Sequence, residues 1–260
     1  MNEQAIHYLP GDTPWQNHIY RYEVTDSTNT QAKELALQGA PNGTVVIADR
    51  QTGGRGRLGR GFHSPGGAGI YMSMILRCQC EPEQLMHLTC AAAVAACDAV
   101  ETVVGFRPGI KWTNDLVSGS RKLAGILTEL ICLPGEVAAV IGIGINCTQT
   151  EADFPPEIRS FAGSLSMVCG KPTDRKQVAS ALIGALLKMD LNRRAEAMAD
   201  YHRDCVTLGK DISLVRGNEI RHGHALDIDE CGALIVRFPD GHTETVNSGE
   251  VSIRGMYGYI

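Results

Sequence analysis

The sequence lacks several features that would assign it to a common class of protein. It contains no C-x-x-C pair, no G-x-x-x-x-G-K-[S/T] phosphate loop and no D-F-G triplet. None of its apolar runs approaches the length of a membrane span, and its start, MNEQAIHYLPGD, lacks the basic and apolar parts of a secretory signal peptide. We therefore expect a cytoplasmic protein that does not enter a membrane.

Cysteine is present but follows no pattern. Nine cysteines are scattered along 260 residues, and the closest two, Cys78 and Cys80, share one face of a predicted strand without further metal ligands beside them. Reduced thiols in the core are therefore expected rather than a zinc site. With 43% hydrophobic residues, a chain of this length can form one large domain and a small one.

Positive charge is also scarce, since the formal net charge is −5, yet three arginines and four glycines occur together in QTGGRGRLGR at 51–60. Apolar runs at 44–48 and 69–77 flank this arginine loop, so we expect it to connect two buried strands. Glycine lets the backbone approach a ligand, and arginine presents a fork of donors suited to carboxylate or phosphate. The arginine loop is therefore predicted to bind an anion.

Three other interpretations of the arginine loop are weaker. Its G-x-G-x-x-G spacing is the dinucleotide fingerprint, but that motif needs a helix to begin within it, which Gly61 and Pro65 oppose. Protein kinases share the spacing, and residues 202–204 read H-R-D, but no asparagine follows at the required distance. A flexible arginine–glycine tail that binds nucleic acid would be longer and repetitive.

Helical periodicity appears in three segments. Residues 31–38 form the first, and Thr28 with Gln31 fits a capping box at its start. Residues 81–104 repeat apolar positions on one face, which predicts a core helix. Residues 175–203 are expected to form one further helix.

Strand patterns at 109–112, 122–132 and 137–146 are joined by short turns, which predicts an antiparallel meander. Residues 147–166 contain three acids and a proline pair but little periodicity, so we expect a loop without stable structure that orders as a cover over bound ligand. From residue 209 onwards, closely spaced strand patterns predict a small barrel.

The meander contains glycines at related positions. Gly142 and Gly144 share one face of their strand, and Gly125 lies in the neighbouring strand. The missing side chains would either floor a pocket for a flat ligand or allow close packing, and the sequence leaves both interpretations open.

Charged residues cluster at one end of the predicted meander. KWTND at 111–115 ends one strand and Lys122 begins the next, so Lys111, Asp115 and Lys122 are expected close together. Without the arginine loop, these three residues would be interpreted as ordinary surface charges on an exposed hairpin. Together with the arginine loop they form a candidate site for activating a carboxylic acid with a nucleoside triphosphate, because that reaction brings a carboxylate, phosphates and a metal into one place.

Taken together, these motifs make the sequence resemble the biotin protein ligases. The matching blocks are DSTN at 26–29, QTGGRGRLGR at 51–60, SPGGAGIYMSM at 64–74, KWTND at 111–115, RKLAGILTEL at 121–130 and VIGIGIN at 140–146. The resemblance implies an α/β (α+β) fold with a mixed-sheet catalytic domain related to class II aminoacyl-tRNA synthetases, which binds biotin and ATP, at 1–207. A small C-terminal SH3-like β-barrel would follow at 208–260.

The resemblance also implies an activity. Such an enzyme would make biotinyl-5′-AMP from biotin and ATP with Mg²⁺, and would then pass biotin to one lysine of the biotin carboxyl carrier domain of a biotin-dependent carboxylase. DNA is not expected as a partner, and a homodimer is left open. The alternatives are a lipoyl or octanoyl transferase of the same superfamily and, from another class, a nucleic-acid-binding module.

Roles for individual residues follow from the same resemblance. The catalytic residues would be Arg57, Lys122, Asp115 and Lys111. Biotin would be bound by Ser27, Thr28, Asn29, Gln51, Gly54, Arg55, Gly56, Arg57, Lys122, Gly125 and Gly142. The nucleotide would be bound by Arg57, Arg60, Lys111, Asn114, Lys122, Asn146 and Arg254. Ser27 and Thr28 have a second interpretation as helix-cap residues, and the metal ligands, the adenine-stacking residue and the role of Asp115 are left open.

The sequence departs from the family pattern at two positions beside these motifs. Thr113 stands where proline is usual and Phe62 where tryptophan is frequent, which bears on ligand affinity. Upstream, 25 residues precede Asp26, whereas an independently folded helix-turn-helix domain needs about 50. We therefore expect a ligase of the monofunctional type, without an N-terminal DNA-binding domain.

Overall fold

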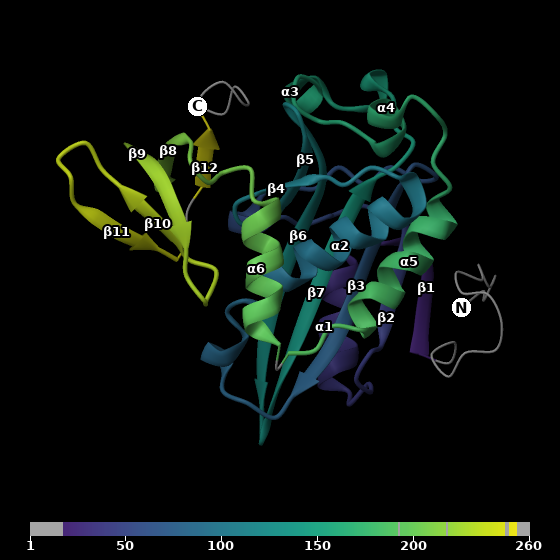
Figure 1. Cartoon of the computed structure of the whole chain (residues 1–260). Coiled ribbons are helices and arrows are strands. Elements are labelled where there is room, and N and C mark those ends of the chain that lie inside the picture. The colour runs from purple at the N-terminus through teal and green to yellow at the C-terminus, as the bar shows by residue number, and fades with distance from the viewer. Residues whose placement is uncertain (1–17, 192, 217, 248–249, 254–260) are drawn as a thin grey trace.

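The computed structural model describes residues 18–191, 193–216, 218–247 and 250–253. These residues form a mixed α/β body around a seven-stranded sheet, and a five-stranded antiparallel sheet lies to one side of it (Figure 1). The predicted combination of a mixed-sheet domain with a small C-terminal β domain is confirmed.

The large sheet has the strand order β1-β2-β3-β7-β6-β5-β4, in which β1 pairs with β2 in parallel and the other neighbours pair antiparallel. The predicted meander is confirmed, with an additional short strand, β5, between its first two predicted members. The strands are β1 (Ile19–Thr25), β2 (Val45–Gln51), β3 (Gly69–Cys78), β4 (Gly109–Lys111), β5 (Asp115–Ser118), β6 (Arg121–Leu133) and β7 (Glu136–Asn146).

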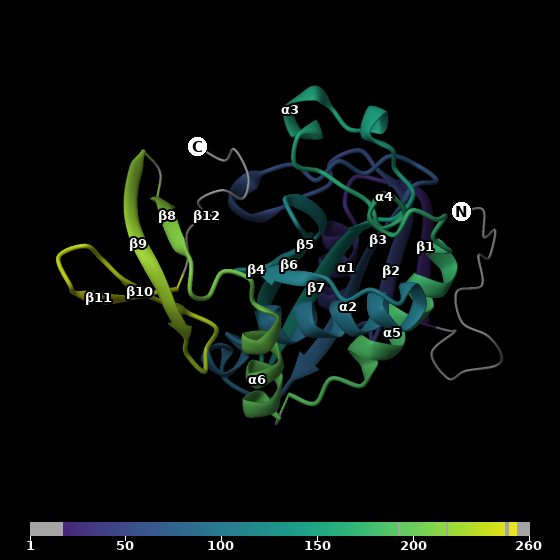
Figure 2. The same ribbon diagram turned by 45° about the horizontal axis from the view of Figure 1, so that its top comes forward.

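Helices cover both faces of this sheet (Figures 1 and 2). The longer helices α2 (Leu88–Val104) and α5 (Arg175–Leu187) pack on one face with α6 (Arg194–Asp204), and α1 (Thr28–Leu37) packs on the other. The shorter elements are η2 (Arg57–Gly59), η3 (Pro82–Leu85), η4 (Glu151–Asp153), α3 (Pro156–Arg159) and α4 (Leu165–Cys169). The sheet is thus buried on both sides, and its loops at one end are left to form a site.

Helix α2 is the centre of the main core. Most of its alanines, valines and cysteines are buried against the sheet and the helices α5 and α6, and it ends where Gly105 adopts the left-handed conformation (φ 75°) that favours glycine. Contrary to the expectation from the sequence, residues 82–104 form a helical segment that is long and apolar enough to span a membrane. However, 72% of its most apolar stretch is buried inside the protein. We therefore interpret this segment as the core helix of a globular domain.

Two predictions about helices are wrong. Residues 175–203 form two helices, α5 and α6, because the chain turns after Leu187. Thr28 does not cap α1 through Gln31, since the helix begins at Thr28 itself and its N-cap residue is Ser27, whose side chain makes no capping hydrogen bond. The Thr28 hydroxyl instead contacts Gln51 of β2 and Ser73 of β3.

The C-terminal sheet has the order β11-β10-β9-β8-β12, which confirms the strand-rich tail. Its strands are β8 (Asp211–Arg216), β9 (Glu219–Ile228), β10 (Leu234–Arg237), β11 (Thr243–Val246) and β12 (Glu250–Ile253). The amide of Val206 donates to the Ile110 carbonyl (2.9 Å), so the chain leading into this sheet is bonded to edge strand β4. The small sheet is thereby attached next to KWTND.

Candidate active site

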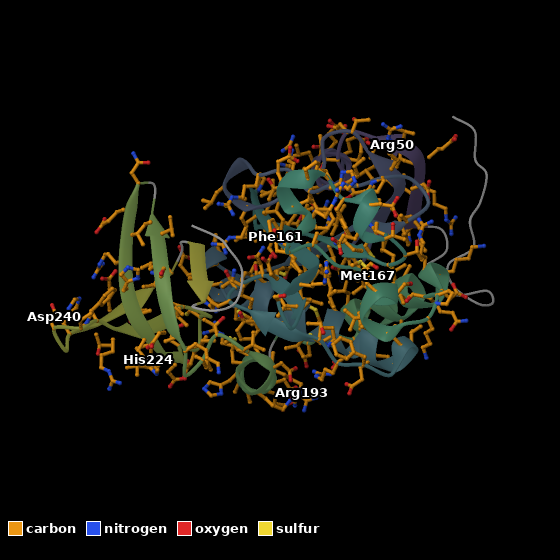
Figure 3. The ribbon with its side chains drawn as sticks, turned by 90° about the horizontal axis from the view of Figure 1, so that it is seen from above. Arg50, Phe161, Met167, Arg193, His224 and Asp240 are labelled. Carbon is orange, nitrogen blue, oxygen red and sulfur yellow. The ribbon has the colours of Figure 1, made fainter. Side chains whose placement is uncertain are left out.

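A cavity of about 530 Å³ opens at the end of the large sheet. Its wall combines the arginine loop, the β4–β5 turn, the start of β6, the end of β7 and the segment after β7. In the view from above, Phe161 of that segment lies between the C-terminal sheet on the left and Met167 on the right (Figure 3).

The structure brings nearly all the predicted site residues to this cavity. Those that line it are Ser27, Thr28, Asn29, Gln51, Arg55, Gly56, Arg57, Arg60, Lys111, Asn114, Asp115, Lys122, Gly125, Gly142 and Asn146. Gly54 does not line it and packs beneath the loop, where an added Cβ would lie 2.4 Å from the Phe62 carbonyl oxygen. Arg254 lies outside the described residues.

Thr28 and Gln51 form the first polar contact in the cavity wall. The backbone N–H of Thr28 donates to Gln51 Oε1 at 2.8 Å, and its hydroxyl lies 3.2 Å from the same oxygen. The other end of the Gln51 amide donates to Ser64 Oγ at 2.9 Å. Both ends of the amide are therefore held, so its orientation is fixed before any ligand contacts it.

Asn29 is held even more tightly, and by residues that sequence reasoning missed. Its Oδ1 lies 2.6 Å from the Ser73 hydroxyl, and its Nδ2 donates to Glu129 Oε2 at 2.9 Å. Lys33 in turn contacts the other Glu129 oxygen at 2.7 Å. Burial alone would raise the pKa of Glu129, but the hydrogen bonds from Lys33 and Asn29 hold that pKa below its usual value. The one sequence signal for this network is Ser73, a polar residue between Met72 and Met74 in a mostly apolar strand.

The glycines of the meander line the cavity, and they also make room for two protein side chains. A Cβ on Gly142 would lie 1.9 Å from Asn29 Oδ1, and one on Gly144 would lie 2.5 Å from the Phe62 ring. Gly125 pairs directly with Gly144 and also faces that ring, at 3.5 Å. The interpretation as a bare floor for a flat ligand is therefore incomplete, because Phe62 and Asn29 occupy part of that floor.

Arg57 reaches across the cavity to the KWTND motif. Its guanidinium donates to the Thr113 hydroxyl and, at 3.2 Å, to Asn114 Oδ1, while Asn114 Nδ2 donates to the Ile126 carbonyl at 2.8 Å. Behind them the Tyr201 hydroxyl donates to the Thr113 carbonyl at 2.9 Å. Full burial raises the pKa of Tyr201, so it stays protonated and keeps this role as donor. Arg57 is thus oriented by a bonded frame.

Lys122 and Asp115 form an ion pair at the same end of the cavity. Lys122 Nζ lies 2.7 Å from Asp115 Oδ1, and both side chains are largely buried, at 26% and 19% exposed. Lys111, directly opposite Asp115 in the β4–β5 pair, is 6% exposed. The predicted convergence of two lysines, one carboxylate and the arginine loop is confirmed as an arrangement in space.

The segment 147–166 differs from its prediction. It contains η4 and α3 and the start of α4, and Phe154 and Leu165 are buried. Phe154, Ile158 and Phe161 line the cavity, so this segment supplies an apolar wall. The expectation of a plain loop is wrong, because the segment forms short helical turns with buried apolar residues beside them, whose spacing is too irregular to show as periodicity. Its ordering as a cover over bound ligand stays a prediction.

Trp112 connects this site to the C-terminal sheet. Its indole N–H donates to the Gly232 carbonyl at 2.9 Å, and its backbone N–H donates to Thr207 Oγ1 at 2.9 Å. The side chain is 3% exposed, so both bonds are shielded from water. The C-terminal sheet thereby supports the strand that carries Lys111.

Replacing Trp112 by phenylalanine should therefore destabilise the protein and the site together. The change removes the indole donor and leaves the Gly232 carbonyl buried without a partner, which costs about 1–3 kcal/mol. Urea unfolding monitored by circular dichroism measures the loss. An unchanged free energy of unfolding would show that this bond does not fasten the two parts.

The sequence and fold of this chain match known proteins over most of its length. A family model described as "Biotin/lipoate A/B protein ligase family" matches residues 22–146, and one described as "Biotin protein ligase C terminal domain" matches residues 207–254. The chain is 37% identical to the bifunctional ligase/repressor BirA of Bacillus spizizenii, with 93% of this chain and 76% of that protein covered. It is 34% identical to the biotin–[acetyl-CoA-carboxylase] ligase of Mycobacterium tuberculosis, with 87% and 85% covered.

Solved structures agree with these sequence matches. The biotin protein ligase from Aquifex aeolicus, in complex with biotin and ATP, superposes with a TM-score of 0.74 at 28% identity. The match covers 91% of this chain and 98% of that one.

Proposed function

This chain belongs to the biotin protein ligase family, and from that premise we propose that it activates biotin as biotinyl-5′-AMP and transfers the biotinyl group to a lysine of a biotin carboxyl carrier domain. The observation that carries this proposal is the cavity in which Arg57, Lys122 and Asp115 lie beside the polar network of Asn29. One end of the cavity is suited to an uncharged polar ring and the other to anions.

We assign the ring of biotin to the end formed by Thr28, Asn29 and Gln51. A ureido ring has two N–H donors and one carbonyl acceptor, and the fixed amides and hydroxyls there can complement both kinds of group. The Phe62 ring beside Gly144 offers an apolar surface for the rest of the bicycle. The carboxylate at the end of the biotin chain then points towards Lys122 and Arg57.

The first reaction joins two anions, and Arg57 and Lys122 reduce their repulsion. A carboxylate oxygen of biotin attacks the α-phosphorus of ATP, a new O–P bond forms, and the bond to pyrophosphate breaks. Charge that builds up on the phosphoryl oxygens is stabilised by cations already in place. Arg57, held by Thr113 and Asn114, has the fork geometry for two oxygens at once.

Magnesium fits this cavity as a companion of the triphosphate. Mg²⁺ binds through one or two carboxylates plus substrate phosphates, and Asp115, whose Oδ1 lies 2.7 Å from Lys122 Nζ, is the carboxylate at this end of the cavity that would hold the ion. When bound, the ion would neutralise phosphate charge. In the described part of the chain no group of three or more His, Cys, Asp or Glu side chains could hold a metal by itself.

The second reaction transfers biotin to the acceptor. The ε-amine of the acceptor lysine attacks the acyl carbon of biotinyl-AMP, an amide bond forms, and AMP leaves. We assign the adenine of the intermediate to the apolar wall of Phe154, Ile158 and Phe161, beside Asn146. This wall excludes water from an anhydride that water would destroy.

We place the domain boundary between residues 207 and 208, after the segment bonded to β4 and before β8. The chain crosses there from the catalytic body to the small sheet, and Thr207 still bonds to Trp112. The C-terminal domain in this proposal completes the active site as well as the fold.

A transfer assay tests the whole proposal. The purified protein, biotin, ATP and Mg²⁺ are incubated with a biotin carboxyl carrier domain, and the acceptor mass is followed. A gain of one biotinyl group, lost when the acceptor lysine is changed to arginine, is the expected result. Addition of a lipoyl group from lipoate would favour a lipoyl transferase. Tight, salt-dependent binding of oligonucleotides without any transfer would favour a nucleic-acid-binding module.

A further inference from the structure

The turn formed by Phe161, Ala162 and Gly163 holds two groups of the cavity through its backbone alone. The Lys122 N–H donates to the Phe161 carbonyl at 2.7 Å, and the Gly163 N–H donates to the Lys122 carbonyl at 2.9 Å. The Asn146 side chain donates to the Gly163 carbonyl at 2.9 Å. This clasp turn, residues 161–163, therefore connects the lysine at the phosphate end with the asparagine beside the apolar wall.

One side chain fastens the clasp turn from outside the cavity. The Arg121 guanidinium donates to the Ala162 carbonyl at 2.9 Å and contacts Glu151 at 3.2 Å. Its stem lies on Gly163, where an added Cβ would be only 2.8 Å from Arg121 Cβ. Arg121 does not line the cavity, so it acts on ligands through the clasp turn.

We propose that Arg121 is a positioning residue that holds the clasp turn, and with it Phe161 and Asn146, in place for the nucleotide. The inference rests on the proposed function, because it assigns the wall at Phe161 to ATP. The contacts of the biotin end run through Thr28, Asn29 and Gln51 on other elements, and Arg121 makes none of them. Arg121 therefore governs the use of ATP and leaves the binding of biotin nearly unchanged.

Replacing Arg121 by alanine separates these two effects. We expect KM for ATP to rise about 10-fold, as for the loss of one charge-assisted hydrogen bond, while the Kd of biotin measured by titration calorimetry changes less than about twofold. Arg121→Lys keeps a cationic donor and a stem, so it should recover part of the loss. Glu151→Gln should have little effect, because its ion pair is exposed and such pairs contribute little.

Gly163→Ala gives an independent test from the other side of the contact. Its Cβ would push the clasp turn away from Arg121, so KM for ATP should rise again with the Kd of biotin unchanged. Gly184→Ala is the matched control, since an added Cβ there meets nothing within 4 Å. If Arg121→Ala does not fold, the comparison of Gly163→Ala with Gly184→Ala still tests whether the clasp turn positions the nucleotide.

The inference is overturned if both cavity ligands weaken equally in Arg121→Ala or in Gly163→Ala, or if KM for ATP does not change. Failure of the proposed function is a different result, in which the unaltered protein forms no biotinyl-AMP. The unaltered protein is therefore assayed first.

Discussion

Replacing Arg57 by alanine should lower the rate of biotinyl-AMP formation by about 100-fold or more. The change removes a cation beside both reacting anions and breaks the contacts to Thr113 and Asn114 that order the arginine loop. Each charge-assisted contact contributes about 1.5–3 kcal/mol, equivalent to roughly 10–100-fold in rate. Pyrophosphate release in the presence of biotin and ATP measures the effect.

Two controls accompany this variant, a lysine at the same position and an alanine at a nearby arginine. Arg57→Lys should recover little, because an ammonium cannot contact two oxygens in the geometry of a guanidinium. Arg50→Ala, an exposed residue at the end of β2 that does not line the cavity, should be close to the unaltered protein. Because the intermediate would leave an unclamped site faster, biotinylation of unrelated lysines should also increase. Near-normal adenylate formation and retention in Arg57→Ala would refute the role given to Arg57.

Replacing Lys122 by alanine should damage adenylate formation far more than transfer. The change removes a phosphate-facing cation, and it also leaves the partly buried Asp115 without its partner, which destabilises the protein. We expect a loss of roughly 100–1,000-fold in pyrophosphate release, because charge-assisted contacts to both reacting anions are lost. Supplied with synthetic biotinyl-AMP, the variant should transfer biotin at a rate within about 10-fold of the unaltered protein.

The double variant Lys122→Met with Asp115→Asn separates stability from chemistry. It removes both charges of the pair, so it should unfold at a denaturant concentration closer to that of the unaltered protein than Lys122→Ala does. Adenylate formation should stay low, because the cation is still absent. If Lys122→Ala impairs transfer from synthetic biotinyl-AMP as severely as adenylate formation, the role of Lys122 is not confined to the first reaction.

Much of the fold could be predicted because its signals are local. Continuous apolar runs identified the strands on both sides of the arginine loop, and short turns identified the meander. The charged ends of that meander were then expected to meet, because antiparallel neighbours return the chain to the same edge. Arg57, Lys122 and Asp115 accordingly line one cavity.

The parts that were missed depend on contacts between distant segments. Thr28 has the sequence pattern of a helix cap, but its partners are Gln51 and Ser73, which only the folded sheet brings beside it. Gly144 is compatible with an open floor or with packing, and the position of the Phe62 ring decides between them. The clasp turn bonds to Lys122, Arg121 and Asn146 through its own backbone groups, which carry no sequence signature.

The most direct test of the proposed activity is whether the purified protein makes biotinyl-AMP by itself. The protein is incubated with biotin, ATP and Mg²⁺ without any acceptor, and the bound and free small molecules are analysed by mass spectrometry. The proposed activity predicts biotinyl-AMP in step with pyrophosphate release, with neither product when biotin is omitted or replaced by lipoate. Pyrophosphate release that does not depend on biotin, or no adenylate at all, would contradict it.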